Sequence, residues 1–398
     1  MDANRFADRI GSLQPSIIRE ILKATQGTNV IPFSAGNPSP ETFPAAEMGE
    51  ISREIFEKDY AMALQYGITE GYGPLRELTC ARLKDKYHMG KDFDRLIITT
   101  GGQQVVDLAA KVMLNEGDTV ICEEPSFIGS LNCFRSYNAN LVGVPMDSEG
   151  IMTDRVEEIL RRDPKVKMIY VIPTFQNPTG GEMSLARRKK LVELADKYGV
   201  LILEDSPYFE LRFAGEQIPS IKSLDDSGCV LYAGSYSKVL SPGMRIGFGL
   251  GPEKLLNKMT VCKQVSDVHT NLFFMILVAR YLERYSLDDH ISRIRDLYRR
   301  RSALMCDTLH EYGKELFSFS RPQGGLFLWL SMQKGNGEQL AKIAASRGVA
   351  AVPGSAFAVS AGAQDAFMRL NYSLPTDDQI VSGIRVLCEA ADEYYASL

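Results

Sequence analysis

The chain has 398 residues, more than a single compact core usually holds, so we expect one large domain and a smaller one. Apolar residues make up 45% and charged residues 24% of the chain, a balance typical of globular proteins in water. The formal net charge of −5 gives no bulk attraction to nucleic acid or to an anionic membrane, and no apolar run approaches the roughly 20 residues of a membrane span. We therefore expect no nucleic-acid partner and no membrane partner.

The start of the chain and its cysteines point to the cytoplasm. The opening MDANRFADRI has no basic stretch followed by an apolar one, so no secretory signal is expected. The seven cysteines are scattered without a Cys-x-x-Cys pair, and the four histidines show no metal-ligand spacing. We predict a cytoplasmic protein with reduced thiols and no metal site.

The first predicted elements form an arm and then an alternating α/β region. Residues 1–44 read as an arm, with a short amphipathic helix at 15–25 and a Gly/Pro-rich stretch after it. Helical periods at 103–114 and 185–198 lie between short apolar runs, which favours βαβ units and a mostly parallel, doubly wound sheet. The predicted strands are 96–100, 119–124, 141–146, 168–172, 200–205, 229–234 and 246–251.

The last third of the chain changes pattern. A long helical region at about 266–312 is followed by alternating strands and helices that predict a small α+β domain. These elements are a strand at 327–330, a helix at 338–346, a strand at 367–372 and a helix at 377–395. We divide the chain into 1–44 (the arm and part of the small domain), 45–280 (the large domain) and 281–398 (the small C-terminal domain).

The first chemical motif is TTGGQQ, where a predicted strand ends and a helix begins. The backbone N–H groups of Gly102 and Gln103 would face an anion at the helix N-terminus. A plain tight turn explains the two glycines equally well. The segment lacks the GxGxxG and GxxxxGK[ST] patterns, so nucleotide binding is not indicated.

Two further motifs follow neighbouring predicted strands. Asn177, in NPTG, could donate a hydrogen bond to a phenolate oxygen, although the same residues also make a good turn. The strand 200–205 delivers Glu204 and Asp205 to opposite faces at its end, and Tyr208 lies three residues further on. A carboxylate there could also cap a helix or bind a metal, but no second ligand cluster accompanies it.

Lys238 lies in GSYSKVLSPGMRIGF, directly after a predicted strand. One lysine among many is normally a surface residue, but loops at strand ends of open α/β sheets build binding sites. Burial and a nearby cation lower the pKa of a lysine, as imine formation requires. Ser235, Ser237 and Arg245 are residue types that hold a phosphate.

Together these residues match the needs of pyridoxal phosphate (PLP). Lys238 could form the imine, and Asp205 could pair with the protonated pyridine nitrogen. Asn177 and Tyr208 could bind the ring oxygen. The phosphate would be held by Gly102, Gln103, Ser235, Ser237 and Arg245.

The ordered motifs resemble the fold-type I PLP-dependent aminotransferases of class I/II. The resemblance covers nearly the whole chain and rests on SAGNPSPETFP, LQYGITEGYGPLRE, TTGGQQ, NPTG, EDSPY, SYSKVLSPGMRIG and MRLNY. PSIIREIL and EEPSFIGSL are similar to the branch that contains 2-aminoadipate and kynurenine aminotransferases. The resemblance implies a PLP-dependent transferase fold with a mostly parallel seven-stranded sheet. It also implies transfer of an amino group from an L-amino acid to a 2-oxo acid, with Lys238, Asp205 and Tyr208 as catalytic residues.

The resemblance assigns further roles that the residues alone do not. Arg369, in MRLNY, would bind the substrate α-carboxylate as a bidentate fork, and Gly36 would approach the same group through its backbone. Tyr66 would reach the phosphate in a neighbouring subunit, which implies a homodimer with shared active sites. Arg19 matches a mobile-arm residue that meets the substrate side chain, although a solvated helix face accounts for it equally well.

Two positions depart from the branch. Phe127 would stack on the cofactor ring, where many relatives have tyrosine, and Asn37 replaces a residue that is usually apolar. The departure at Asn37 leaves the substrate preference open.

Three other functions compete with this one. A C–S lyase or another PLP enzyme of the same fold could use the same lysine, aspartate and arginine. A PLP-binding transcriptional regulator would carry a winged-helix domain of roughly a hundred residues, and we expect no room for one before the aminotransferase-like arm. A dinucleotide-binding protein would need the missing glycine fingerprint.

Overall fold

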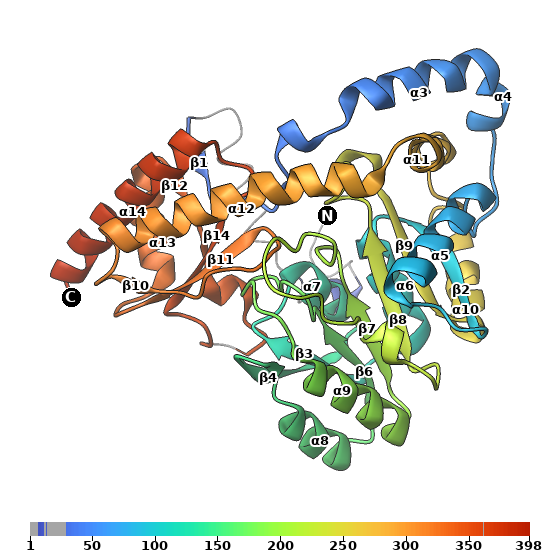
Figure 1. Ribbon diagram of the computed structural model, residues 1–398. Coiled ribbons are helices and arrows are strands. Elements are labelled where there is room, and N and C mark those ends of the chain that lie inside the picture. The colour runs from blue at the N-terminus through green and yellow to red at the C-terminus, as the bar shows by residue number, and fades with distance from the viewer. Residues whose placement is uncertain (1–6, 12, 14–28, 361) are drawn as a thin grey trace.

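The computed structural model describes residues 7–11, 13, 29–360 and 362–398 (Figure 1). The helix predicted at 15–25 and Arg19 lie outside the described residues, so their predictions stay untested. The described chain begins with the short helix α1 (Asp8–Gly11).

A central sheet of eight strands organises the larger part of the molecule, in the order β2-β9-β8-β7-β6-β3-β4-β5. All seven predicted strands are present, and the sheet is mostly parallel as expected. β9 runs antiparallel to both β2 and β8, and the two-residue β5 turns back on β4 as an eighth strand that was not predicted. The strands are β2 (Asp94–Thr100), β3 (Thr119–Glu124), β4 (Asn140–Asp147), β5 (Gly150–Ile151), β6 (Val166–Val171), β7 (Leu201–Asp205), β8 (Val230–Ser235) and β9 (Ile246–Pro252).

Both faces of this sheet are covered, which explains its nearly continuous apolar strands. Met168 and Tyr170 of β6 pack into one hydrophobic cluster, while Ile169 and Val171 pack into another on the opposite face. Helices α6 (Gly102–Met113), α7 (Ile128–Arg135) and α10 (Glu253–Gln264) contribute to the first cluster. Helices α8 (Thr153–Arg162) and α9 (Leu185–Tyr198) cover the second.

The helical region predicted at 266–312 is two helices rather than one. α11 (Leu272–Arg284) ends before Ser286, and the Ser286 side chain accepts from Asp289 N as the N-cap of α12 (Leu287–Tyr312). α11 packs near the β2 edge of the sheet with three helices from earlier in the chain. These are α3 (Ala45–Lys58), α4 (Tyr60–Ala63) and α5 (Gly73–Tyr87).

A smaller antiparallel sheet follows α12, in the order β10-β11-β14-β13. The segment before α3 joins this part of the molecule, because β1 pairs with β12 in parallel. The small strands are β1 (Ile31–Pro32), β10 (Phe317–Ser318), β11 (Phe327–Met332), β12 (Val349–Ala350), β13 (Val352–Pro353) and β14 (Phe367–Asn371). Helices α13 (Gly337–Ser346) and α14 (Asp377–Ala396) cover them.

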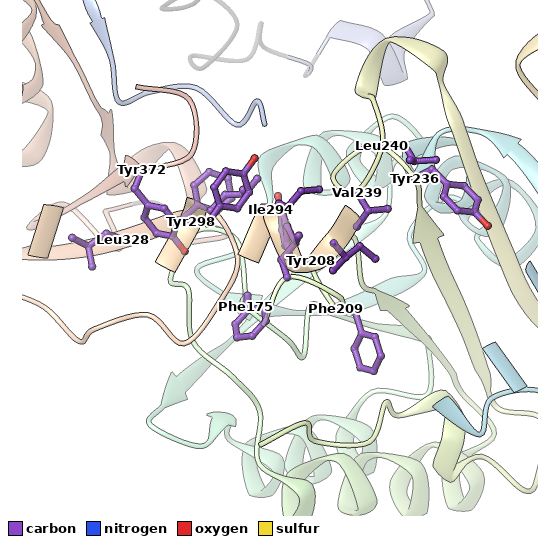
Figure 2. Packing of buried hydrophobic residues seen from close by; sticks show 14 of the residues in the cluster. Phe175, Tyr208, Phe209, Tyr236, Val239, Leu240, Ile294, Tyr298, Leu328 and Tyr372 are labelled. Carbon is purple, nitrogen blue, oxygen red and sulfur yellow. The ribbon is translucent and has the colours of Figure 1, made fainter. Parts of the chain in front are cut away.

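One hydrophobic cluster connects the two sheets through α12. Figure 2 shows Ile294 and Tyr298 of α12. Leu328 of the smaller sheet lies on one side of them, and Val239, after β8, lies on the other. No helix in the described part of the chain is both long and apolar enough to cross a bilayer.

Candidate active site

The carboxyl ends of β6, β7 and β8 bring the main predicted residues to one edge of the central sheet. Asp205 is the last residue of β7, and Lys238 follows the end of β8 by three residues. Asn177 lies on the loop after β6. Neighbouring parallel strands end at the same edge of a sheet, so residues distant in sequence meet there.

Lys238 is half-buried, and its Nζ donates a hydrogen bond to the carbonyl oxygen of Gly36 at 2.7 Å. Burial lowers the pKa of Lys238 to about 8, and the positive charges of Arg369 and Arg245 act in the same direction. A substantial fraction of this amine is therefore neutral near physiological pH, as a nucleophilic lysine requires.

Asp205 is buried, and the Tyr170 hydroxyl donates to its Oδ2 at 2.8 Å. Burial raises the pKa of Asp205 to about 6, while the bond from Tyr170 opposes that rise. A cation beside Asp205 would keep its carboxylate ionised. Tyr170 was not predicted from the sequence, because it looks like any other apolar position of a buried strand.

Asn177 links two other predicted site residues, Tyr208 and Arg369. Its Oδ1 accepts from Arg369 Nη1 at 2.9 Å, and its Nδ2 donates to the Tyr208 hydroxyl at 3.5 Å. Burial raises the pKa of Tyr208 above its ordinary value, so the phenol stays protonated.

Arg369, on β14, is only 2% exposed and reaches this edge from the smaller sheet. Its Nη2 donates to Ser34 O at 2.8 Å, and its guanidinium lies over the rings of Phe327 (4.2 Å) and Phe357 (4.9 Å). Burial lowers the pKa of Arg369 to about 10. No carboxylate pairs with it within the described residues, and its buried Nε has no hydrogen-bond partner there. A buried arginine without a carboxylate partner is suited to bind an anionic ligand.

A tight cradle forms where α6 begins. Gly101 has φ +78°, and a Cβ at this position would lie 2.3 Å from Arg245 Nη2, so only glycine allows the approach. Ser235 Oγ donates to Ser237 Oγ at 2.8 Å beside this turn. Gly102 is the first residue of α6, whose free N–H groups favour an anion.

Gln103 and Phe127 meet at the start of α7. Gln103 Nε2 donates to Gly129 O at 3.2 Å, and a Cβ at Gly129 would lie 2.6 Å from the Phe127 ring. The Phe127 ring therefore packs closely over the α7 backbone.

Tyr66 stands apart from these residues. It is 79% exposed, and its ring packs edge-on against His269 with a centroid distance of 5.8 Å. Within the described part of the chain it makes no hydrogen bond to another predicted site residue.

The side chains at this edge of the sheet fit PLP. It offers an amine of lowered pKa, a buried carboxylate and a phenol, together with a glycine-shaped cradle beside an arginine and two hydroxyls. These are the groups needed for an aldehyde, a pyridinium nitrogen, a ring oxygen and a phosphate.

The sequence and the fold are similar to those of known proteins. The family model "Aminotransferase class I and II" matches residues 28–387. The chain is 38% identical over 393 residues to aromatic-amino-acid aminotransferase 1 of Thermococcus litoralis, covering 98% of this chain and 94% of that protein. It is 36% identical to 2-aminoadipate transaminase of Thermus thermophilus, covering 97% and 96%. It also superposes on the structure of α-aminoadipate aminotransferase from Thermus thermophilus, complexed with N-(5'-phosphopyridoxyl)-L-leucine, with a TM-score of 0.91, 35% identity and coverage of 100% and 99%.

The chain therefore belongs to the class I and II aminotransferase family. It is a PLP-dependent enzyme that transfers amino groups between amino acids and 2-oxo acids, as the sequence predicted.

Sequence reasoning missed Glu123 as well as Tyr170. Glu123 lies in β3, is fully buried, and accepts hydrogen bonds from Ile172 N at 3.0 Å and Gln176 Nε2 at 3.2 Å. Its position one residue before the end of a buried strand was the available signal, because a carboxylate there must find partners.

Proposed function

We propose that this aminotransferase acts on a broad range of L-amino acids that includes 2-aminoadipate and aromatic amino acids. The observation that carries the proposal is the buried Arg369 without a carboxylate partner in the described chain, at the same sheet edge as Lys238 and Asp205. The names of the relatives, an aromatic-amino-acid and a 2-aminoadipate enzyme, support this substrate range.

We assign each residue a task in the reaction. Arg369 forks onto the substrate carboxylate, with the Gly36 backbone beside it. Lys238 holds the cofactor and, once free, takes the proton from the substrate Cα as general base. When bound, PLP supplies an aldehyde carbon and a ring that accepts electrons. Asp205 keeps the ring nitrogen protonated, and Asn177 and Tyr208 donate to the ring oxygen.

The phosphate contacts are proposed at the start of α6. Gly102 and Gln103 offer backbone N–H groups, and Phe127 offers a ring face for stacking. The remaining donors are Ser235, Ser237 and Arg245.

We also propose a cytoplasmic homodimer with shared active sites, serving amino acid metabolism and biosynthesis. Exposed apolar side chains on two segments support the dimer, because large apolar side chains left in contact with water mark protein interfaces when they gather. We call these side chains together the 56–68/261–268 surface; Tyr66, in the first segment, packs against His269, which directly follows the second. Its members are Phe56, Tyr60, Met62, Leu64, Tyr66, Ile68, Val261, Val265 and Val268.

The test is a half-reaction of the purified holoenzyme with single L-amino acids. We expect 2-aminoadipate and aromatic amino acids to convert the bound cofactor to pyridoxamine phosphate, with one 2-oxo acid released per site. Lys238→Ala, reconstituted with PLP, should give none. Release of pyruvate and ammonia from cysteine conjugates, without any need for an oxo-acid acceptor, would instead establish a lyase.

A further inference from the structure

Glu123 is a buried carboxyl group that the proposed reaction does not use. Its side chain is 0% exposed, and within the described residues its Oε1 has no hydrogen-bond partner. Only Oε2 is bonded, by Ile172 N and Gln176 Nε2. A fully buried carboxyl group with one unpartnered oxygen is costly even when it is neutral, so its place here calls for a physical reason.

Gln176, the side-chain partner of Glu123, is held in a single orientation by further contacts. Its Nε2 also donates to Pro125 O at 2.8 Å, and its Oε1 accepts from Thr179 N at 2.9 Å. Its backbone N–H donates to Gly181 O at 2.9 Å. Glu123 and Gln176 therefore bind the loop after β6 to the end of β3.

This loop carries the next residue, Asn177, into the candidate active site. Asn177 Oδ1 accepts from Arg369 Nη1, which orients the guanidinium toward one edge of the site. A continuous set of contacts thus runs from Glu123 through Gln176 and Asn177 to Arg369.

The charges around Glu123 favour its neutral form. Burial raises the pKa of Glu123 to about 8, and the negative charge of Asp205 on β7 acts in the same direction. The bonds from Ile172 and Gln176 and the positive charge of Arg188 on α9 oppose the rise. The Tyr170 phenol of β6 also lies close, and Glu123 raises the pKa of that phenol.

We propose that Glu123 is a positioning residue for substrate carboxylate recognition, which acts through Gln176 and Asn177 on Arg369. The proposal rests on the function proposed for Arg369. It explains why a carboxyl group with one unpartnered oxygen lies at this depth: it acts on the binding of the substrate and leaves the proton transfer at Lys238 unchanged.

Two variants test the link from its two ends. Glu123→Ala and Gln176→Ala should each raise the KM for the amino acid about tenfold with kcat changed less than about twofold, because each variant removes the buried hydrogen bond between the two side chains. Glu123→Gln retains an accepting oxygen and should restore KM to within about twofold of the wild type. The double variant Glu123→Ala/Gln176→Ala should be no worse than either single variant, since both cut one chain of contacts.

Glu204 provides a matched control. It is also a buried glutamate near a strand end, and it accepts from Ile221 N at 3.1 Å and Lys222 N at 2.7 Å. These bonds tie Glu204 to the segment before β8 rather than to Asn177 or Arg369. Glu204→Ala, the counterpart of Glu123→Ala, should lower the unfolding midpoint without changing KM.

The outcomes separate this proposal from the function on which it rests. Arg369→Lys, measured in parallel, should raise KM by at least about tenfold. An unchanged KM in Arg369→Lys would overturn the proposed role of Arg369. A raised KM in Arg369→Lys with an unchanged KM in Glu123→Ala and Gln176→Ala would overturn the role of Glu123 alone. If Glu123→Ala does not fold, the other two variants test the proposal. A normal KM in Gln176→Ala would contradict it, and so would a raised KM in Glu123→Gln.

Discussion

At the scale of single residues, Asp205 should act through its charge. Asp205→Asn keeps the size but loses the negative charge that holds a ring nitrogen protonated, so kcat/KM should fall by about 100-fold or more. Phe127→Tyr adds a hydroxyl to a stacking ring and should change kcat/KM by less than about threefold. Steady-state kinetics with saturating PLP measure both. Near-normal rates in Asp205→Asn would show that another group pairs with the ring.

Gly101 should control cofactor affinity. Its φ is positive, and a Cβ added there would lie 2.3 Å from Arg245 Nη2, so Gly101→Ala should displace the arginine side chain. We expect the Kd for PLP to rise about tenfold, measured by titrating the apoenzyme.

Gly102→Ala is the matched control for this prediction. A Cβ at Gly102 meets its nearest neighbours at 3.8 Å, an ordinary contact distance. Equal losses of affinity in the two variants would contradict a cradle shaped by Gly101.

Glu123 should make stability depend on pH. Its pKa is about 8 in the folded chain and lower when unfolded, so the folded state holds the extra proton between these values. This contribution to stability is fully present below about pH 4.5 and is lost as pH rises toward 8. The unfolding free energy of the wild type relative to Glu123→Gln should fall by about 1 kcal/mol per pH unit in that range, measured by urea unfolding. A difference independent of pH would show that Glu123 is ionised throughout.

At the scale of elements, Lys222 joins the start of β2 to the start of β8. Its Nζ is buried and bonds Asp94 Oδ1 at 2.7 Å, Asp225 Oδ2 at 2.9 Å and Val230 O at 3.0 Å. Lys222→Met would leave two buried carboxylates without their cation, so we expect a loss of about 3–5 kcal/mol in unfolding free energy. Lys254→Met, on the exposed side of α10, should change it by less than about 0.5 kcal/mol. Chemical denaturation of both variants provides the comparison.

Some of the helices and strands could be predicted from the sequence, and others could not. Most of the seven long strands were predictable because burial of both faces makes them continuous apolar runs, although β4 is only partly buried. The two-residue strands β1, β5, β10, β12 and β13 carry no such signal, since they are too short for a pattern and are positioned by the strands that they pair with. The break between α11 and α12 depends on one serine cap, which a helical period spanning 266–312 hides. The division at 44 and 280 stays a prediction.

Part of the candidate active site could be predicted from the sequence for the same reason. The position of Lys238, Asp205 and Asn177 at one sheet edge was predictable, because each polar residue lies at the end of an apolar strand or shortly after it. Tyr170 and Glu123 were not, because their partners lie across neighbouring strands whose pairing the sequence does not reveal.

At the scale of the whole molecule, the 56–68/261–268 surface should hold two chains together. Leu64→Glu combined with Val265→Glu places charges at two highly exposed apolar positions, 69% and 76% exposed in one chain. We expect sedimentation to show monomers, and activity to fall at least about tenfold if the active sites are shared as proposed.

Leu398→Glu is the control for the dimer prediction. Leu398 is 64% exposed but lies at the end of the chain, after α14. A double variant that stays dimeric would place the interface elsewhere.

Arg369 is held by the loop after β6, by the segment before α3 and by two aromatic rings. An aminotransferase admits two substrates in succession to one place, and what they have in common is a carboxylate and the neighbouring carbon. If Arg369 binds that carboxylate, as we propose, a guanidinium anchored from several directions holds the common end of both molecules at the same point. Differences in length or shape between the two substrates are then met only at the opposite end of the site. A change of substrate preference would need substitutions only there, and the residues proposed for the reaction would stay as they are.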